Sequence, residues 1–417
     1  MKLKEVLEKE ISKISLDEIE LEKINGYTDF IVESLKKNLK KKKIKADVFV
    51  GGSLAKNTLI DKKVQDVDVF VRFSKSEDIE KLNSCFNGIS GKLEKIHGSR
   101  DYFKLKFKEV IFEIVPVLKI SNPEKAENIT DLSYFHVSYV MKSIKKNPKL
   151  GNEIKLAKSF CHGQRCYGAE SYIRGFSGYG LELLIIHYGS FEKFIKAMIK
   201  TLGKIVIDPS KFYKNKDDVY MNMNEAKLES PIVFVDPTFK QRNALAALSQ
   251  ETFSRFKIAC KKFLKSPSLK YFEIDEIDEN KLFDFAKKRK LEFLKLKIKT
   301  DRQEGDIAGT KLHKFYRFLI NKIEKYFDVV KKEFVYNDKK EAEIYFVLKS
   351  RKEIVVNGPP KRLEIRVKDF KKKWKNAKVK NGVFYAKEKV NFSGKKYVDV
   401  LKKKYKNVIK EMGGGWG

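Results

Sequence analysis

Two aspartates stand two residues apart in a short apolar run, residues 64–73, and they are the first candidates for chemistry. In a β-strand such residues point to the same face, so Asp66 and Asp68 would lie side by side, about 6–7 Å apart at Cα. Two ionised carboxylates on a largely buried strand are unfavourable unless a cation lies between them. Mg²⁺ prefers oxygen ligands and usually shares them with a phosphate. The alternative is a solvated strand face that carries two acidic side chains.

A glycine-rich turn precedes these aspartates. Gly51-Gly52-Ser53 follows the apolar run 48–50, and a short helical segment holding Lys56 and Thr58 is expected after it. Glycine lets a backbone approach a ligand closely, and a serine hydroxyl beside the N–H groups that open a helix suits an anion. A phosphate-binding turn followed by a strand with paired aspartates predicts a nucleotidyltransferase active site.

A third acidic residue lies in a later strand. Residues 102–107 and 110–117 read as two strands joined by a turn at Lys108 and Glu109. In the second strand Glu113 shares a face with apolar side chains, and three explanations are open. It pairs with a lysine, it projects from a strand end, or it completes a metal site. Beside the glycine turn and the two aspartates, the third explanation is favoured.

The composition indicates a polyanionic partner. The 417 residues include 90 Lys and Arg against 56 Asp and Glu, a net charge of +34. Such an excess repels itself unless a polyanion such as nucleic acid offsets it, although an AT-rich genome or a salt-adapted lineage would also raise the number of lysines. No apolar run approaches the roughly 20 residues of a membrane span, and no leader precedes the first helix, so a cytoplasmic protein is expected. The four cysteines lack CxxC spacing and are expected to be buried free thiols: Cys85, Cys161, Cys166 and Cys260.

Helices are expected around this strand unit and in the middle of the chain. Hydrophobic spacing predicts two helices over residues 3–44, the second capped by Ser15. Further helices are expected near 77–89 and 137–143, at a segment ending near Lys158, and at 181–188 after the glycines of RGFSGYG. These glycines and Ser177 suit either a phosphate or tight helix packing. A last helix in this region is expected at 244–265, with Arg242 at its start.

The C-terminal part is basic and contains no new catalytic pattern. Helices are expected near 279–293 and 311–327, and strands at 328–335, 342–349 and 362–367, the last two flanking a loop at 353–360. From residue 361 onward there are 19 Lys and Arg against 5 Asp and Glu, interleaved with aromatic residues. This pattern predicts a surface for RNA, with Lys371, Lys372, Lys373 and Trp374 as candidate contacts; the alternative is a small domain with a lysine-rich exterior. The GGGWG tail is expected to be disordered.

The order of these motifs resembles the archaeal-type, or class I, CCA-adding tRNA nucleotidyltransferases. The resemblance is carried by GGSLAKNTL, DVDVF, FEIVP, YFH, LAKSF, CYGAESYIRGFSGY and DPTFKQRNALAALS, and it is strongest between residues 48 and 249. It implies an α+β protein with a polymerase-beta-like nucleotidyltransferase head that contains a mixed sheet (1–145), a central helical neck domain (146–255), and an α+β body and tail that bind RNA (256–417). The implied activity is template-independent addition of C, C and A to the 3′ end of tRNA from CTP and ATP.

The resemblance also assigns roles to individual residues. It implies that Asp66, Asp68 and Glu113 bind Mg²⁺ and are catalytic. Nucleotide contacts are implied for Ser53, Lys56, His136, Lys158, Tyr167 and Arg242, the last as the arginine that helps to select C or A. This chain departs from the family pattern in having Asp66 where Glu is frequent, Glu113 where Asp is typical, and Lys56 where Arg is frequent. Lysine lacks the guanidinium fork, so the phosphate contact at position 56 differs in geometry.

Two other functions stay open at this point. One is another RNA 3′ nucleotidyltransferase of the poly(A) type, which would add nucleotides without stopping after three. The other is an RNA-binding protein that has kept the fold without activity, although the intact set of carboxylates argues against it. Whether the protein forms a homodimer is left open by the sequence.

Overall fold

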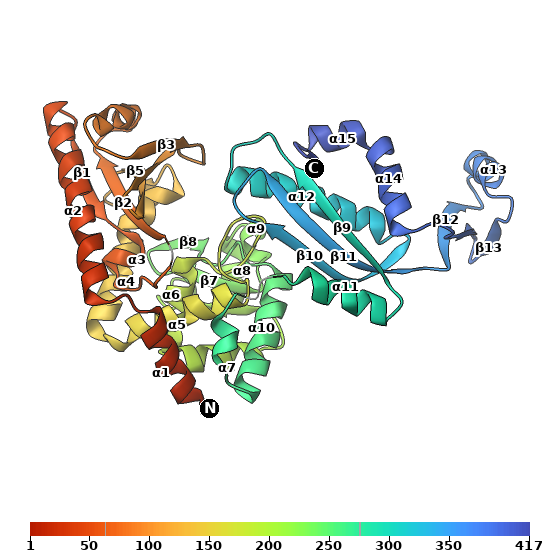
Figure 1. Cartoon of the computed structure of the whole chain (residues 1–417), viewed down its shortest axis with the longest axis horizontal. Coiled ribbons are helices and arrows are strands. Elements are labelled where there is room, and N and C mark those ends of the chain that lie inside the picture. Colours follow the sequence, from red (N-terminus) through yellow and green to blue (C-terminus); the bar gives the residue numbers. More distant parts are fainter. Residues whose placement is uncertain (63, 275–276) are drawn as a thin grey trace. The chain divides into compact units, whose positions relative to one another are not determined.

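The computed structural model describes residues 1–62, 64–274 and 277–417, and it divides into two units (Figure 1). The first contains residues 1–169 and 173–274, and the second contains residues 170–172 and 275–417. The stretch 48–73 therefore passes through one residue, 63, that lies outside the described part of the chain. The finer division of the chain at 145 and 255 stays a prediction.

A mixed sheet forms the N-terminal part of the first unit. Its strands in the described residues run in the order β1 (Ala46–Val50), β2 (Gln65–Phe73), β5 (Val110–Leu118), β4 (Tyr102–Phe107) and β3 (Lys92–Ile96). β2 pairs with β5 in parallel, and the other neighbours are antiparallel. This confirms the predicted mixed sheet and the hairpin of β4 and β5. Strand β3 was not predicted, because three of the five residues in its sequence KLEKI are charged, and these three are exposed.

The long helix α2 packs against this sheet. α1 (Leu3–Ile14) precedes α2 (Glu18–Lys41), whose Ile31, Leu35 and Leu39 are buried in one cluster with Val67 and Val69 of β2. The N-cap of α2 is Asp17, which accepts a hydrogen bond from the N–H of Glu20, so the expected cap at Ser15 was wrong. The segment predicted as a helix at 77–89 is the 3₁₀ segment η1 (Ser76–Phe86).

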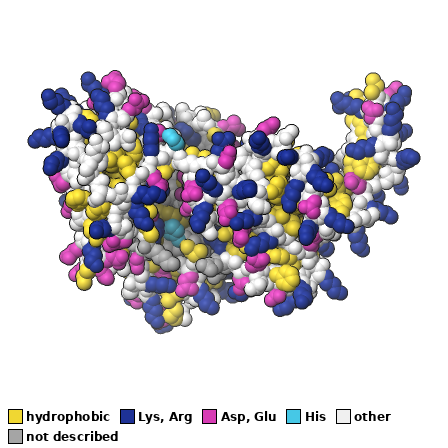
Figure 2. Space-filling view, turned by 45° about the horizontal axis from the view of Figure 1, so that its top comes forward, with side chains coloured by type: hydrophobic (Ala, Val, Ile, Leu, Met, Phe, Trp, Pro, Cys, Tyr) yellow, Lys and Arg dark blue, Asp and Glu magenta, His cyan; other side chains and the backbone are white. Residues whose placement is uncertain are grey.

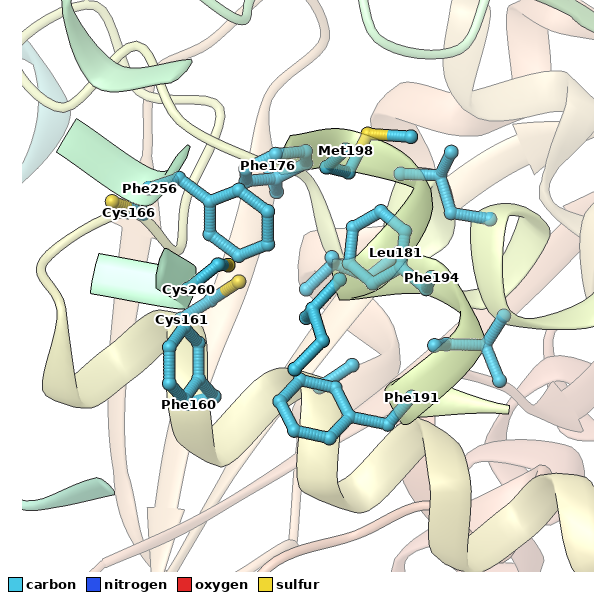
Figure 3. Packing of buried hydrophobic residues seen from close by; sticks show 14 of the residues in the cluster. Phe160, Cys161, Cys166, Phe176, Leu181, Phe191, Phe194, Met198, Phe256 and Cys260 are labelled. Atoms are coloured by element: carbon cyan, nitrogen blue, oxygen red, sulfur yellow. The ribbon is translucent and has the colours of Figure 1, made fainter. Parts of the chain in front are cut away.

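The rest of the first unit is mainly helical. Its helices are α4 (Ser133–Lys146), α5 (Lys149–Gly163), α6 (Gly178–Tyr188), α7 (Phe191–Lys200), α8 (Lys216–Asn222), α9 (Glu225–Leu228) and α10 (Gln250–Lys265), beside a sheet of β6 (Ile205–Ile207), β7 (Ile232–Asp236) and β8 (Phe239–Asn243). An aromatic core joins α5, α6, α7 and α10, with Phe160, Phe176 and Phe256 fully buried (Figure 3). All four cysteines are buried free thiols, as predicted.

Two helix starts that differ from the prediction change the place of a candidate residue. α4 begins at Ser133, four residues earlier than expected, so His136 lies within the helix instead of preceding it. α10 begins at Gln250, where Ser249 caps it by accepting from the N–H of Thr252. Arg242 consequently lies on strand β8 and not at a helix start. The serine cap decides the start of α10, since it satisfies an N–H group that the helix leaves unpaired.

The second unit contains a four-stranded antiparallel sheet in the order β10 (Phe327–Tyr336), β11 (Glu341–Ser350), β9 (Glu292–Lys299) and β15 (Gly415–Trp416). Its core includes α12 (Asp306–Ile323) together with α14 (Gly394–Lys404) and α15 (Lys406–Glu411). The helix expected at 279–293 is α11 (Glu279–Lys288), followed by β9. The GGGWG tail is ordered, in contrast to the expectation, because β15 pairs with β9 and Trp416 packs on Phe315.

A smaller sheet within this unit also corrects the prediction. β12 (Glu353–Pro360), β14 (Val383–Lys389) and β13 (Lys378–Lys380) pair in that order, with α13 (Glu364–Lys373) beside β12. The expected loop at 353–360 is therefore strand β12, and the strand expected at 362–367 is mostly the start of α13. An edge position explains how β12 accommodates two prolines at its end, since an edge strand leaves some N–H groups outside the ladder.

Candidate active site

The three candidate metal ligands share one face of the mixed sheet. In the parallel register of β2 and β5, Asp68 is the direct partner of Glu113, and Asp66 is the partner of Ile111. Val67 and Val69 point to the opposite face and are fully buried. Because paired residues of neighbouring strands project to the same side, the carboxylate of Glu113 lies on the side of Asp66 and Asp68.

Burial and repulsion between the neighbouring carboxylates disfavour the ionised forms of Asp66 and Asp68. Burial, followed by the charges of Glu113 and Asp66, raises the pKa of Asp68 to about 6, although Lys56 and Lys158 act in the opposite direction. The pKa of Asp66 is raised as well, by burial first and then by Glu113. A divalent cation between these groups would remove the repulsion, so the acidic set fits such an ion.

Glu113 also has a lysine partner. Nζ of Lys104 on β4 lies 2.9 Å from Oε1 of Glu113, so the first of the three explanations for this glutamate is realised in the structure. Among the described residues, no group of three acidic, histidine or cysteine side chains has the arrangement of a closed metal site. Mg²⁺ usually takes only one or two carboxylates and completes its shell with water and substrate phosphates. The set therefore fits an ion shared with a phosphate.

The glycine turn is built against Asp68. The N–H of Gly51 donates to the carbonyl oxygen of Asp68 at 2.8 Å. Gly52 has φ +58°, and a Cβ placed on it would lie 1.7 Å from Oδ2 of Asp68. Glycine is therefore required at position 52 for both conformation and space. The turn continues into the short helix α3 (Gly52–Ala55), which contains Ser53 but ends before Lys56 and Thr58, in contrast to the expected longer segment.

The two lysines expected to contact phosphate share one buried glutamate. Nζ of Lys56 lies 2.7 Å from Oε2 of Glu182, and Nζ of Lys158 lies 3.0 Å from Oε1 of the same side chain. Lys158 also donates to Oγ1 of Thr58 at 2.9 Å. These side chains are buried, with Glu182 only 1% exposed. Glu182 was missed by the sequence reasoning, and its signal was a single acidic residue inside the apolar helix 181–188.

Burial and pairing compete in this cluster. Burial would raise the pKa of Glu182, but the charges of Lys158 and Lys56 outweigh it, so the pKa lies below its usual range. Burial lowers the pKa of Lys158, and the second lysine adds to this effect, while Glu182 opposes it. A carboxylate between two ammonium groups is thus ionised and leaves the cluster with a net positive charge, which suits an anionic ligand.

His136 and Arg242 meet at Asp236, a buried residue at the end of β7. Nη1 of Arg242 donates to Oδ2 of Asp236 at 2.6 Å, and the hydroxyl of Tyr179 donates to Oδ1 at 3.0 Å. Nε2 of His136 lies 3.1 Å from Oδ2 but without the alignment of a hydrogen bond, and its ring stacks on Tyr179. Burial would raise the pKa of Asp236, but His136 and Arg242 hold it well below the usual range. The partner of Arg242 in the structure is thus an aspartate.

Tyr167 lies apart from this aspartate cluster, next to the start of α6. Its ring stacks on His162 with centroids 4.0 Å apart, and a Cβ on Gly178 would lie 2.8 Å from its hydroxyl. Ser177 caps α6 by accepting from the N–H of Gly180, and a Cβ on Gly180 would lie 2.5 Å from Leu245. Of the two explanations for these glycines, tight packing holds at Gly180.

The candidate RNA contacts lie in the second unit. Lys371, Lys372 and Lys373 form the last turn of α13 and are exposed, and Trp374 ends that helix and is half-buried. Nζ of Lys373 lies 5.7 Å from the centre of the Trp374 ring. The small sheet of β12, β13 and β14 forms a basic lobe together with α13. Lys and Arg side chains gather on the visible face of this basic lobe (Figure 2). These residues form a basic surface with an aromatic side chain in it.

Comparison with known proteins places this geometry in a family. The family described as "Nucleotidyltransferase domain" matches residues 32–135, and the family described as "tRNA nucleotidyltransferase, second domain" matches residues 152–273. A CCA-adding enzyme of Nanoarchaeum equitans is 34% identical over 283 residues, which are 67% of each chain. The chain belongs to the CCA-adding enzyme family. A second member, from Methanosarcina acetivorans, is 30% identical over 86% of this chain and 78% of its own.

Solved structures agree with this family at the level of the fold. A cytoplasmic RNA terminal U-transferase superposes with a TM-score of 0.51 at 15% identity and covers 66% of this chain and 99% of its own. The Cid1 poly(U) polymerase gives a TM-score of 0.51 at 12% identity. The α+β fold is thus as the sequence predicted, and the family matches show that the protein is a nucleotidyltransferase. Within the described residues, no helix has the length and apolar character to cross a membrane.

Proposed function

We propose that this member of the CCA-adding enzyme family adds C, C and A to the 3′ end of tRNA, using CTP and ATP and releasing pyrophosphate. The observation that carries the proposal is the pairing of Asp68 with Glu113 beside the Gly51–Gly52 turn, in a chain similar to CCA-adding enzymes over most of its length. No template strand is needed if the protein and the RNA end together present donors and acceptors to the incoming base. We propose that this reaction takes place in the cytoplasm.

The acidic face would hold a divalent metal, and Mg²⁺ is the ion we propose. Asp66, Asp68 and Glu113 are its proposed ligands, and they are also the catalytic residues. Such an ion supplies a lower pKa for the RNA 3′-hydroxyl and neutralises charge on the leaving pyrophosphate. The chain itself supplies the sheet face that fixes Asp68 against Glu113, and the glycine turn that brings backbone next to Asp68.

The remaining candidates would position the nucleotide. An ammonium group has three N–H donors, and the contacts of Lys56 and Lys158 with Glu182 and Thr58 leave donors for triphosphate oxygens. Ser53 in the turn would contact the same triphosphate. His136 and Tyr167 would contact phosphate or sugar. Arg242 has five N–H donors, of which Asp236 takes one in the described contacts, so the others can reach acceptors on a base edge.

The basic lobe of the second unit would hold the tRNA. Lys371, Lys372 and Lys373 are exposed and can contact phosphates, while Trp374 offers an aromatic ring to an unstacked base. Double-stranded RNA is recognised mainly through its shape and backbone, so a set of lysines without base-specific groups suffices for this task.

Sizing the products on a tRNA that lacks its 3′ CCA tests the proposal. With CTP alone the product should stop after two added nucleotides, and with CTP and ATP together it should stop after three. An open-ended A tail would contradict the proposal and favour a poly(A)-type enzyme. No transfer of labelled CTP in the presence of Mg²⁺ would favour an RNA-binding protein without activity.

A further inference from the structure

A buried carboxylate joins the glycine turn to the central helices. Glu182 lies on α6, Lys158 on α5, and Lys56 directly after α3. Both oxygens of Glu182 are used, Oε2 by Lys56 at 2.7 Å and Oε1 by Lys158 at 3.0 Å. One side chain therefore fixes the positions of two ammonium groups that come from different elements.

Burial of these three charged side chains costs free energy, and ligand binding would explain why it is kept. The exposed fractions of Lys56, Lys158 and Glu182 are 9%, 4% and 1%. Taking charges out of water is expensive, and two lysines against one carboxylate leave a positive charge that the described contacts do not balance. The acidic residues Asp66 and Asp68 lie on the neighbouring sheet face, and the charges of both lysines act to lower the pKa of Asp68. The imbalance is relieved when an anion joins the cluster.

We propose that Glu182 is a positioning residue that holds Lys56 and Lys158, both charged, in place to receive the triphosphate of the incoming nucleotide. This inference rests on the proposed function of the site, and it adds a residue to which no nucleotide contact was assigned. Glu182 itself does not touch the substrate. It prevents the two ammonium groups from repelling each other and from swinging out to solvent, so that their remaining N–H donors stay on the side of the ligand.

The alternative is a role in folding alone, and a second buried glutamate gives the matched control. Glu10 on α1 is 2% exposed and accepts a hydrogen bond from the Ser159 hydroxyl, so it packs against the same helix α5 beside Lys158. It makes no contact with Lys56 or Lys158 in the described structure. Glu10→Gln therefore reports what loss of a buried carboxylate does to this layer of helices without disturbing the lysine pair.

The test measures the binding of CTP, and of inorganic tripolyphosphate as a competitor, to the full-length wild type and to E182Q, E182D and E10Q. In E182Q the Kd of both ligands should rise at least about tenfold, because the ammonium groups lose a charged partner. The KM for CTP should rise with them, while kcat changes less and the Kd for tRNA is unchanged. E182D keeps the charge but is one methylene shorter, so its values should lie between those of wild type and E182Q. E10Q should bind both ligands as the wild type does.

Several outcomes would overturn this inference. One is a folded E182Q with the CTP and tripolyphosphate affinity of the wild type; another is an equal loss in E10Q, which would indicate a general effect of structure. If E182Q does not fold, E182D decides, and unchanged CTP binding in E182D contradicts the proposal. Tripolyphosphate binding is measured without tRNA and without turnover. Failure of CCA addition by the wild type would therefore reject the proposed function, but the tripolyphosphate measurement could still be interpreted.

Discussion

Asp68 and Glu113 are direct partners across the parallel pairing of β2 and β5, so two acidic side chains from strands far apart in the sequence project from the same point of one sheet. The next carboxylate on that face is Asp66, and a glycine turn lies against Asp68. This arrangement collects negative charge beside the glycine turn, and a cation between the carboxylates would relieve their repulsion.

Asp68→Asn should abolish nucleotide transfer while leaving tRNA binding nearly unchanged. A metal ligand supplies several kcal/mol of charge stabilisation, so kcat should fall by at least about a thousandfold. Single-turnover addition of CMP to truncated tRNA measures this, with a filter-binding assay for the RNA. Asp47→Asn is the control, because Asp47 lies on β1 of the same sheet and pairs with Arg72 and Lys119. Retained turnover in Asp68→Asn would remove the assignment of this residue to the metal.

The metal-free protein should be less stable at neutral pH than its Asp68→Asn variant. The pKa of Asp68 is raised to about 6 in the folded state, so its stabilising effect is present below the unfolded pKa near 4 and is lost as the pH rises towards 6. Above pH 6 the wild type should lose up to about 3 kcal/mol relative to the variant. Urea unfolding in EDTA at pH 4 and pH 7.5 measures the difference. Equal curves at both pH values would contradict it, and added Mg²⁺ should stabilise only the wild type.

Lys104→Met should lower the Mg²⁺ concentration needed for activity. Nζ of Lys104 neutralises Glu113 at 2.9 Å and competes with a cation for that carboxylate. Removing one positive charge at this range should tighten binding of a divalent ion about threefold to tenfold. Mg²⁺ titration of the rate measures it, with Lys95→Met on β3 as the control, since Lys95 pairs with Asp101. An unchanged or higher Mg²⁺ requirement would show that Glu113 does not contribute to the metal site.

Asp236→Asn should destabilise the protein and weaken base selection together. Asp236 accepts from Arg242, Tyr179 and Thr238 and is fully buried, so an amide there breaks a charged pair at a cost of about 3 kcal/mol. The guanidinium of Arg242 is then no longer held by an opposite charge. Urea unfolding and the ratio of CTP to UTP incorporation measure the two effects. Asp208→Asn is the control, because Asp208 accepts from the backbone of Tyr213 near the same sheet. A stable variant with unchanged selectivity would reject the role of Asp236.

Replacing Lys371, Lys372 and Lys373 together by alanine should weaken tRNA binding and its dependence on salt. The slope of log K against log salt should fall by about one for each lysine that binds a phosphate in the wild type. The matched control is the triple replacement of Lys40, Lys41 and Lys42, an equally exposed run at the end of α2. If both triple variants bind alike at every salt concentration, α13 is not an RNA contact.

The sequence alone was sufficient to predict that Asp66 and Asp68 lie on one face of a strand. The alternation that places Asp66 and Asp68 opposite Val67 and Val69 is a local property of a strand. A shift of the strand register by one residue would have exchanged the two faces. The hairpin of β4 and β5 was equally readable, because short apolar strands and a tight turn follow one another directly. Motif order was enough to indicate the family, which the comparisons bear out.

The same local reasoning gave the wrong structure for segments whose conformation depends on packing against distant parts of the chain. Residues 353–360 became a strand because β14 lies beside them, and the GGGWG tail became ordered because β9 offers an edge and Phe315 offers a ring for Trp416. Neither partner is visible in the segment itself. Propensity is a weak guide in such segments, since a strand is stabilised by whatever pairs with it.

The partners of the charged residues were decided by the tertiary structure alone. The sequence determined that Lys56, Lys158 and Arg242 are cations in a nucleotide-binding chain, since residue type and motif are local. Only the fold brought Glu182 to both lysines, 126 and 24 residues away along the chain, and His136 of α4 to Asp236 of β7. The energy of a buried charge depends on which opposite charge lies within a few ångströms, and that distance exists only after the helices and sheets have packed.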